Sequence, residues 1–86
     1  MTQITILEHV VYADGSANPV SVTVTKDGCT VAWQQRATDA SLTWAQMGDV
    51  EHLSDVFEDS SVRAFKVIVQ VLGKVHANKD AYMMVL

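Results

Sequence analysis

The sequence predicts an α+β fold in one small domain, residues 1–86: a three-stranded antiparallel β-meander, then two helices, then a short C-terminal strand. Three patterns support this prediction. Apolar residues alternate on both sides of an Asp-Gly pair, apolar residues recur at helical spacing further on, and one polar stripe runs through a later segment. We assign residues 1–36 to the meander, 43–77 to the helices and 81–86 to the terminal strand.

The first strand is predicted from four apolar residues of one parity, Ile4, Ile6, Val10 and Tyr12. Side chains two residues apart lie on the same face of a strand, so these four would form an apolar face. Glu8 has the same parity, and we expect a bulge near Glu8 and His9 to turn it outward.

The next two strands are predicted from VSVTVTKDGCTVAW, in which Asp27-Gly28 separates two alternating runs and suits a type I′ turn. Folding about this turn gives three cross-strand pairs: Lys26 with Cys29, Val24 with Val31, and Val22 with Trp33. The apolar partners then share one face. The other face holds Ser21, Thr23, Thr25, Thr30, Ala32 and Gln34. An antiparallel sheet with one apolar face needs a covering layer, which we expect the helices to supply.

The first helix is predicted from a capping-box pattern, TWAQ, that begins at Thr43. Apolar residues follow at helical spacing: Met47, Val50, Leu53 and Phe57. Gly48 weakens a helix by about 1 kcal/mol relative to Ala, so a helix that begins only at Asp49 is the alternative. Acidic residues at a helix C-terminus oppose the macrodipole, which favours an end near Glu58, with Asp59 or Ser60 capping the next helix.

The second helix is predicted over residues 61–77, although VIVQVL is rich in β-branched residues and could form a buried strand. The polar residues favour the helix, because they follow one narrow helical stripe and would fall on both faces of a strand. They are Arg63, Lys66, Gln70 and Lys74. The apolar remainder covers about 220° of circumference, whereas ~100° suffices to cover a sheet. This helix should therefore contact the sheet and the first helix, or a second subunit. AYMMVL should pair with the sheet edge or with a partner.

Charge is distributed unevenly along a chain whose net charge is −4. No Lys or Arg lies between Arg36 and Arg63, and this part carries −6, whereas residues 63–86 carry +3. Direct nucleic-acid binding needs a basic surface, so the acidic middle disfavours it. A lone Cys29 forms no internal disulfide, and no apolar run is long enough to cross a membrane. We therefore expect a cytoplasmic protein that does not bind membranes.

The candidate site is the acidic segment DVEHLSDVFED, residues 49–59. On a helix, its polar side chains fall roughly opposite the apolar stripe. They form either an ordinary solvated helix face or a face that binds a basic partner. Trp44 at the helix entry is either a core residue or a partly exposed anchor. The candidate partner-binding residues are Asp49, Glu51, His52, Asp55, Glu58, Asp59 and Trp44.

Metal binding and catalysis are disfavoured, both at this segment and at Cys29. His52, Asp55 and Asp59 are metal-ligand types within reach of one another on a helix, but no paired His or Cys motif accompanies them. Acids on one exposed helix lack the cleft that tunes a catalytic pKa. Cys29 follows the turn on the apolar face, where a thiol packs as a small hydrophobe. We expect no metal, no cofactor and no enzymatic activity.

We therefore expect a small protein-interaction module, an inhibitor or adaptor, whose acidic helix face (residues 48–59) binds a basic, nucleic-acid-binding surface of a partner protein. In size, charge and lack of catalytic motifs, the chain resembles the short acidic inhibitors that phages encode, anti-CRISPR proteins among them. No sequence motif carries this resemblance. The alternative is a homo-oligomeric assembly subunit, such as a homodimer, that associates through the apolar second helix and residues 81–86.

Overall fold

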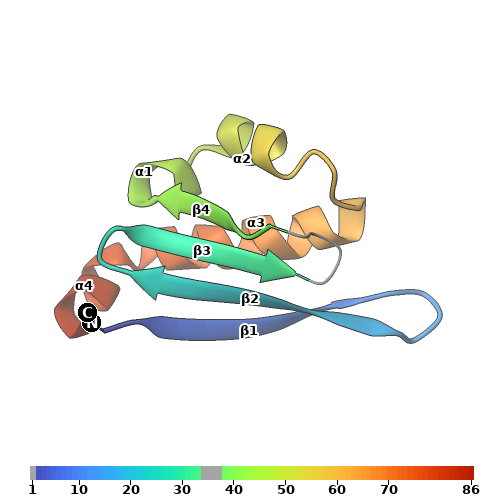
Figure 1. Ribbon diagram of the computed structural model, residues 1–86, viewed down its shortest axis with the longest axis horizontal. Helices are drawn as coiled ribbons and strands as arrows, with labels where there is room; N and C mark the ends of the chain where they lie inside the picture. The colour runs from blue at the N-terminus through green and yellow to red at the C-terminus, as the bar shows by residue number, and fades with distance from the viewer. Residues whose placement is uncertain (1, 34–37) are drawn as a thin grey trace.

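The computed structural model describes residues 2–33 and 38–86, and it shows an α+β fold in which an antiparallel sheet is followed by helices (Figure 1). The strands are β1 (Ile4–Val11), β2 (Ala17–Thr25), β3 (Gly28–Trp33) and β4 (Ala40–Thr43). The helices are α1 (Trp44–Met47), α2 (Val50–Val56), α3 (Val62–Ala77) and α4 (Lys79–Val85). Spatial strand order is β1-β2-β3-β4. Gln34 and Arg36, at the end of the predicted meander, lie outside the described residues.

The sheet has one strand more than predicted, and the predicted C-terminal strand is wrong. β4 pairs antiparallel with β3 and occupies the edge on that side of the sheet. Its four residues are too short a segment for alternation to identify. Most of residues 81–86 belong to α4 instead, whose Ala and Met residues favour a helix. Tyr82 of α4 packs against the core.

β2 and β3 form the predicted hairpin with the predicted faces, but the register differs from the prediction by two residues. Val24 pairs with Cys29, and Val22 pairs with Val31. The turn residues are therefore Lys26 and Asp27, and neither has positive φ, so the turn is not type I′. A shift of two residues preserves side-chain parity, which is why the assignment of faces is unaffected.

Gly28 is required by the close approach of β4. It pairs with Thr43 and has a φ of +148°. A Cβ atom built on Gly28 would lie 1.9 Å from the backbone oxygen of Leu42, closer than any side chain allows. The Asp-Gly pair thus predicts the correct hairpin, but its glycine is needed for the close approach of β4 to β3 and not for the turn.

β1 pairs with β2 without interruption, from Ile4 opposite Val24 to Val11 opposite Ala17. The predicted bulge near Glu8 and His9 is therefore wrong. Glu8 has the parity of the apolar face and is nevertheless exposed. Because β1 is an edge strand, a long side chain there reaches water without any distortion of the backbone.

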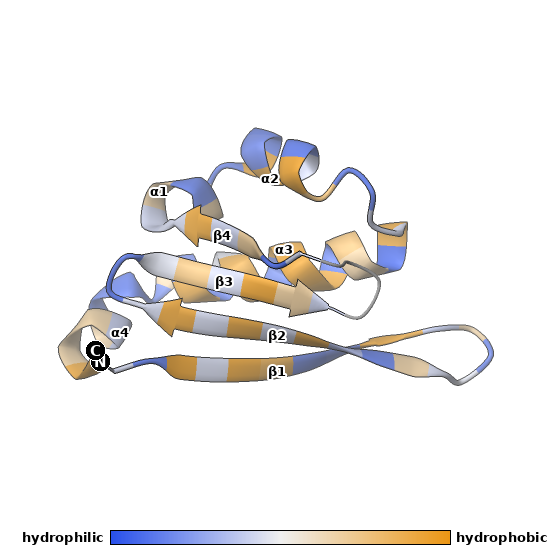
Figure 2. Ribbon diagram, viewed as in Figure 1, coloured by the Kyte–Doolittle hydropathy of each residue, from blue (hydrophilic) through white to orange (hydrophobic). Residues whose placement is uncertain are grey.

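The core lies between the sheet and the helices. Figure 1 shows α3 running behind the strands, and Figure 2 shows hydrophobic residues alternating with polar ones along β2 and β3. Trp33 of β3 packs against Phe57, with 5.2 Å between ring centroids. The largest fully buried side chains are Phe57, Met47, Leu53, Ile68 and Leu72, together with Val10, Val20, Val22, Val24, Val31 and Val75.

The first predicted helix is divided in two at Gly48 and Asp49. Thr43 caps α1 through the predicted capping box: its hydroxyl accepts from the Gln46 N–H at 3.3 Å, and its N–H donates to the Gln46 side-chain oxygen at 2.9 Å. Asp49 then caps α2, its carboxylate accepting from the His52 N–H at 3.2 Å. A Cβ at Gly48 would lie 2.7 Å from the ring of His76, so the break brings the chain close to α3.

The second predicted helix is confirmed over the strand alternative. Ser61, rather than Asp59 or Ser60, caps α3, because its hydroxyl accepts from the Ala64 N–H at 3.2 Å. As predicted from its wide apolar face, α3 contacts more than one element of the same chain: β1, α1 and α4. Within the described residues, no helix is both long enough and apolar enough to span a membrane.

Replacing Gly28 with Ala should lower the free energy of unfolding by about 2–4 kcal/mol, because the new methyl group meets the Leu42 backbone. Gly73→Ala is a matched control: Gly73 lies in α3 with no neighbour within 4 Å of a Cβ. This variant should gain about 0.5–1 kcal/mol. Urea denaturation measures both, and a Gly28→Ala variant as stable as the wild type would contradict the close approach of β4.

Candidate protein-interaction surface

The acidic segment comprises the link after α1, α2 and the turn that follows α2, on the upper side of the molecule in Figure 1. Three apolar side chains hold it to the core: Leu53 and Phe57 are each only 1% exposed, and the half-buried Val56 also packs against the core. Because these side chains lie on one side of α2, the opposite side of this short helix faces solvent.

Five carboxylates are exposed along this segment: Asp49, Glu51, Asp55, Glu58 and Asp59. We refer to these five residues as the acidic surface. Glu51 and Asp55 are four residues apart on α2 and lie on one helix face, where like charges repel by a few tenths of a kcal/mol. His52, also predicted at this site, is half-buried. The structure thus brings six of the predicted site residues together on α2 and the residues that flank it.

The seventh predicted residue, Trp44, is a core residue. Its side chain is 7% exposed, and its indole N–H donates to the backbone oxygen of Lys26 at 2.9 Å. The Tyr82 ring lies 6.3 Å from the Trp44 ring, and the Lys79 ammonium group lies 5.8 Å from the ring centroid. Trp44 therefore joins α1 to the β2–β3 turn and to α4, and it contributes nothing to the acidic surface.

A shallow recess of about 230 Å³ adjoins the acidic surface between α2 and the start of α3. Its lining residues are Ser54, Phe57, Glu58, Ser60, Val62 and Phe65. The recess combines aromatic and aliphatic walls with one carboxylate, that of Glu58. Sequence periodicity did not identify it, because its residues come from two helices and the turn between them.

Metal ligation finds no support from the geometry of this surface. In residues 2–33 and 38–86, no three His, Cys, Asp or Glu side chains come together in a group that could hold a metal ion. The sequence spacing of His52, Asp55 and Asp59 therefore does not produce a ligand cluster.

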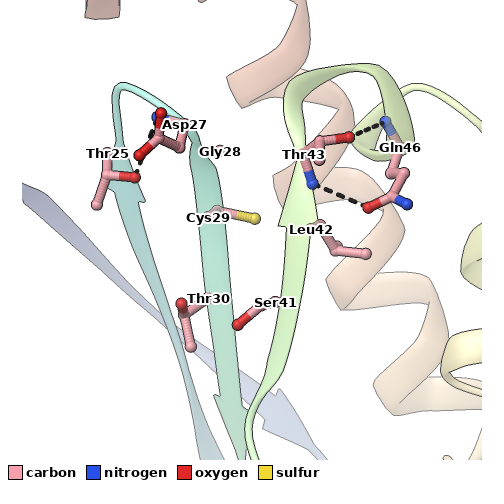
Figure 3. Close-up of a pocket in the computed structure, with 9 residues that line it drawn as sticks. All are labelled: Thr25, Asp27, Gly28, Cys29, Thr30, Ser41, Leu42, Thr43 and Gln46. Carbon is pink, nitrogen blue, oxygen red and sulfur yellow. Dashed lines mark hydrogen bonds between the residues drawn. The ribbon is translucent and has the colours of Figure 1, made fainter.

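A second recess, of about 320 Å³, lies at the turn end of the β2–β3 hairpin beside β4 (Figure 3). Hydroxyl groups of Thr25, Thr30, Ser41 and Thr43 lie around it, because these residues share the polar parity of three adjacent strands. Several polar groups there are bonded locally. The Thr25 hydroxyl accepts from the Asp27 N–H at 3.3 Å, and Thr43 and Gln46 form the capping box of α1. Local structure accounts for these groups without a ligand.

Cys29 also borders this recess, but its side chain is buried and 5% exposed. It pairs with Val24 on one side and Leu42 on the other. Burial raises the pKa of the Cys29 thiol to about 11, so the thiol is protonated at neutral pH and is not a thiolate nucleophile. Its predicted role as a small hydrophobe in the core agrees with this position.

Replacing Cys29 with Ala should lower the free energy of unfolding by about 1 kcal/mol at pH 7, because a buried side chain is truncated. Burial raises the pKa of this thiol from an ordinary value of 9.0 to about 11 in the folded chain. Wild-type stability should therefore decrease as pH rises from 9 to 11, since only the unfolded thiol ionises there. The Cys29→Ala variant lacks this decrease, so the difference in the free energy of unfolding between the wild type and the variant should become smaller as pH rises. Urea denaturation across that pH range measures it, and a constant difference would contradict a buried, protonated thiol.

Comparison with protein-family models, with curated proteins and with solved structures finds no match to this chain. The observations that bear on its function are therefore the charge, exposure and geometry of its own residues.

Proposed function

We propose that this chain is a small, non-enzymatic protein-interaction module that binds a basic surface of another protein through the acidic surface. The observation that carries the proposal is that all five carboxylates of the acidic surface are exposed and that no Lys or Arg occurs from residue 37 to residue 62. Like charges held this close repel one another. A cationic partner would relieve that repulsion and would be attracted over a distance of about 8–10 Å at physiological salt.

The recess beside Glu58 supports a partner rich in Arg and Lys. These side chains combine an apolar stem with a cationic end. A stem could lie against Val62 and Phe65 while its charge approaches the Glu58 carboxylate. A nucleic-acid-binding groove presents many such side chains. We therefore propose that the partner is a nucleic-acid-binding protein and that this chain acts on it as an inhibitor or an adaptor. We place the interaction in the cytoplasm, where a lone Cys29 remains reduced.

A homo-oligomeric assembly subunit is the second candidate, and a different observation favours it. α4 exposes Met83, Met84 and Val85, of which Met84 is 86% exposed. Adjacent exposed apolar residues are typical of contact surfaces. In Figure 1, α4 lies at the lower left and α2 lies at the top of the molecule, so one chain could use α4 for self-association and the acidic surface for a partner.

The test is a charge reversal with a matched control. Asp55→Lys with Glu58→Lys alters the acidic surface, whereas Asp27→Lys with Asp80→Lys makes the same change in net charge at exposed sites elsewhere. Proteins retained by the tagged wild type from a lysate are identified, and their affinities are measured by calorimetry at low and high salt. Loss of two ion pairs should weaken binding by about tenfold or more in the first variant and much less in the control.

Higher salt should weaken wild-type binding in the same direction, since screening acts on exposed charges. An affinity that is insensitive to salt, or equal reductions in the two variants, would contradict the proposal. Retention of acidic or neutral proteins alone would contradict it as well.

A further inference from the structure

Of the two edge strands that the described sheet presents, only β1 is long and regular. β4 has four residues, whereas β1 has eight and pairs with β2 without a bulge or a proline. Among the described residues, Figure 1 shows no element beyond β1. Natural proteins usually protect such an edge with distortion, proline or a covering segment, because its free backbone groups can pair with another strand.

The hydrogen-bond parity of β1 identifies the residues whose backbone groups face the open edge. The Tyr12 N–H donates to the Ser16 oxygen at 2.9 Å, so Tyr12 and every second residue before it face β2. Thr5, Leu7, His9 and Val11 therefore face outward. Two observations agree with this assignment. The outward Val11 oxygen accepts from the Arg63 guanidinium at 2.9 Å, and His9 lies opposite Pro19, which has no N–H to donate.

Two of these outward residues have exposed apolar side chains. Leu7 is 59% exposed and Val11 is 58% exposed, and both have the parity of the sheet face opposite the core. The edge of β1 thus offers the outward backbone groups of Thr5, Leu7 and His9, the N–H of Val11, and two uncovered aliphatic side chains on one face of the sheet.

We propose that β1 of one copy pairs antiparallel with β1 of a second copy about a two-fold axis at His9, which joins the two sheets edge to edge. In this register Leu7 lies opposite the partner's Val11, and Val11 lies opposite the partner's Leu7. Each exposed aliphatic side chain therefore gains an aliphatic neighbour, an arrangement that stabilises antiparallel pairs. The surface is distinct from the acidic surface and does not depend on it.

Charge complementarity supports the second copy as the occupant and selects this register. A groove of about 590 Å³ runs between β1 and α3 and is lined by Val10, Val11, Arg63 and Lys66, among others. In the proposed pairing, the partner's Glu8 lies opposite Val10 and so enters the basic part of this groove. The exposed Glu8, which has the parity of the face that α3 covers, is directed toward the same side as these cations. The two-fold axis makes this contact twice.

Neighbouring registers lose the aliphatic pair. With the axis at Glu8, Leu7 would lie opposite His9, and Glu8 would lie opposite its own copy, where like charges repel. With the axis at Val10, Val11 would lie opposite His9 instead of Leu7. An axis between residues of opposite parity would place outward backbone groups against inward ones, so they would not bond. The axis at His9 allows the backbone hydrogen bonds, the aliphatic pair and the contact of Glu8 with the basic groove to form together.

Cysteine cross-linking tests the register. In the proposed dimer the two copies of residue 9 are opposite each other, about 5.5 Å apart at Cα, within the range that a disulfide spans. His9→Cys should therefore give a covalent dimer under mild oxidation. Thr5→Cys has the same parity and exposure, but its two copies would be about 27 Å apart, so it should remain monomeric. Cys29 is buried and should give no background in the wild type.

Cross-linking through Leu7→Cys in preference to His9→Cys would overturn the register. Equal cross-linking of His9→Cys and Thr5→Cys, or none in either, would overturn the β1 interface itself.

A charge exchange tests the groove contact independently. Glu8→Lys should weaken dimerisation by about tenfold, because it places a cation beside Arg63 and Lys66. Adding Lys66→Glu should restore much of the affinity, since the pair is then reversed. Dimerisation is measured by sedimentation equilibrium at concentrations up to about 200 µM, because an interface formed by one pair of strands is small and binds weakly. A strictly monomeric wild type, or a Glu8→Lys variant that dimerises as well as the wild type, would contradict the proposal.

Discussion

Burial of the valine face of β2 and β3 against the helices is the constraint on which the other features of this molecule depend. Val22, Val24 and Val31 are completely buried, and α3 lies behind them in the covering layer. The core is small, and the short helix α2 is held to it by Leu53, Phe57 and the half-buried Val56. These anchors determine the orientation of α2 and direct its carboxylates to solvent. The acidic surface is therefore a consequence of the same packing that stabilises the sheet.

That packing also leaves surface uncovered. The helices meet one face of the sheet, and β4 forms one edge with four residues. Among the residues that the structure describes, β1 is left as an open edge. A charged surface and an unpaired edge offer different kinds of contact, one through long-range attraction and one through backbone hydrogen bonds. They lie on different parts of the fold, so the two proposed contacts would not compete for the same surface.

The differences between predicted and observed structure have specific physical causes. The faces of the hairpin were predictable because a two-residue shift preserves side-chain parity. The register was not, because Gly28 lies in β3 against the Leu42 backbone of β4 and not in the turn. The predicted bulge at Glu8 was wrong because an edge strand lets a charged side chain reach water unaided. The predicted cap of α3, Asp59 or Ser60, was wrong because Ser61 is equally suited to cap a helix and occupies that position. For the candidate site, the segment was predictable but the burial of Trp44 and the recess beside Glu58 were not.

The sequence by itself determined the α+β class, the faces of the hairpin, the helical nature of residues 62–77 and the outward direction of the carboxylates around α2. Each of these follows from local periodicity, which needs no knowledge of distant contacts. Only the tertiary structure decided the fourth strand, the helical form of α4, the buried position of Trp44 and the openness of the β1 edge. Those features depend on which segments meet across the sheet, because short or ambiguous segments take their conformation from their neighbours.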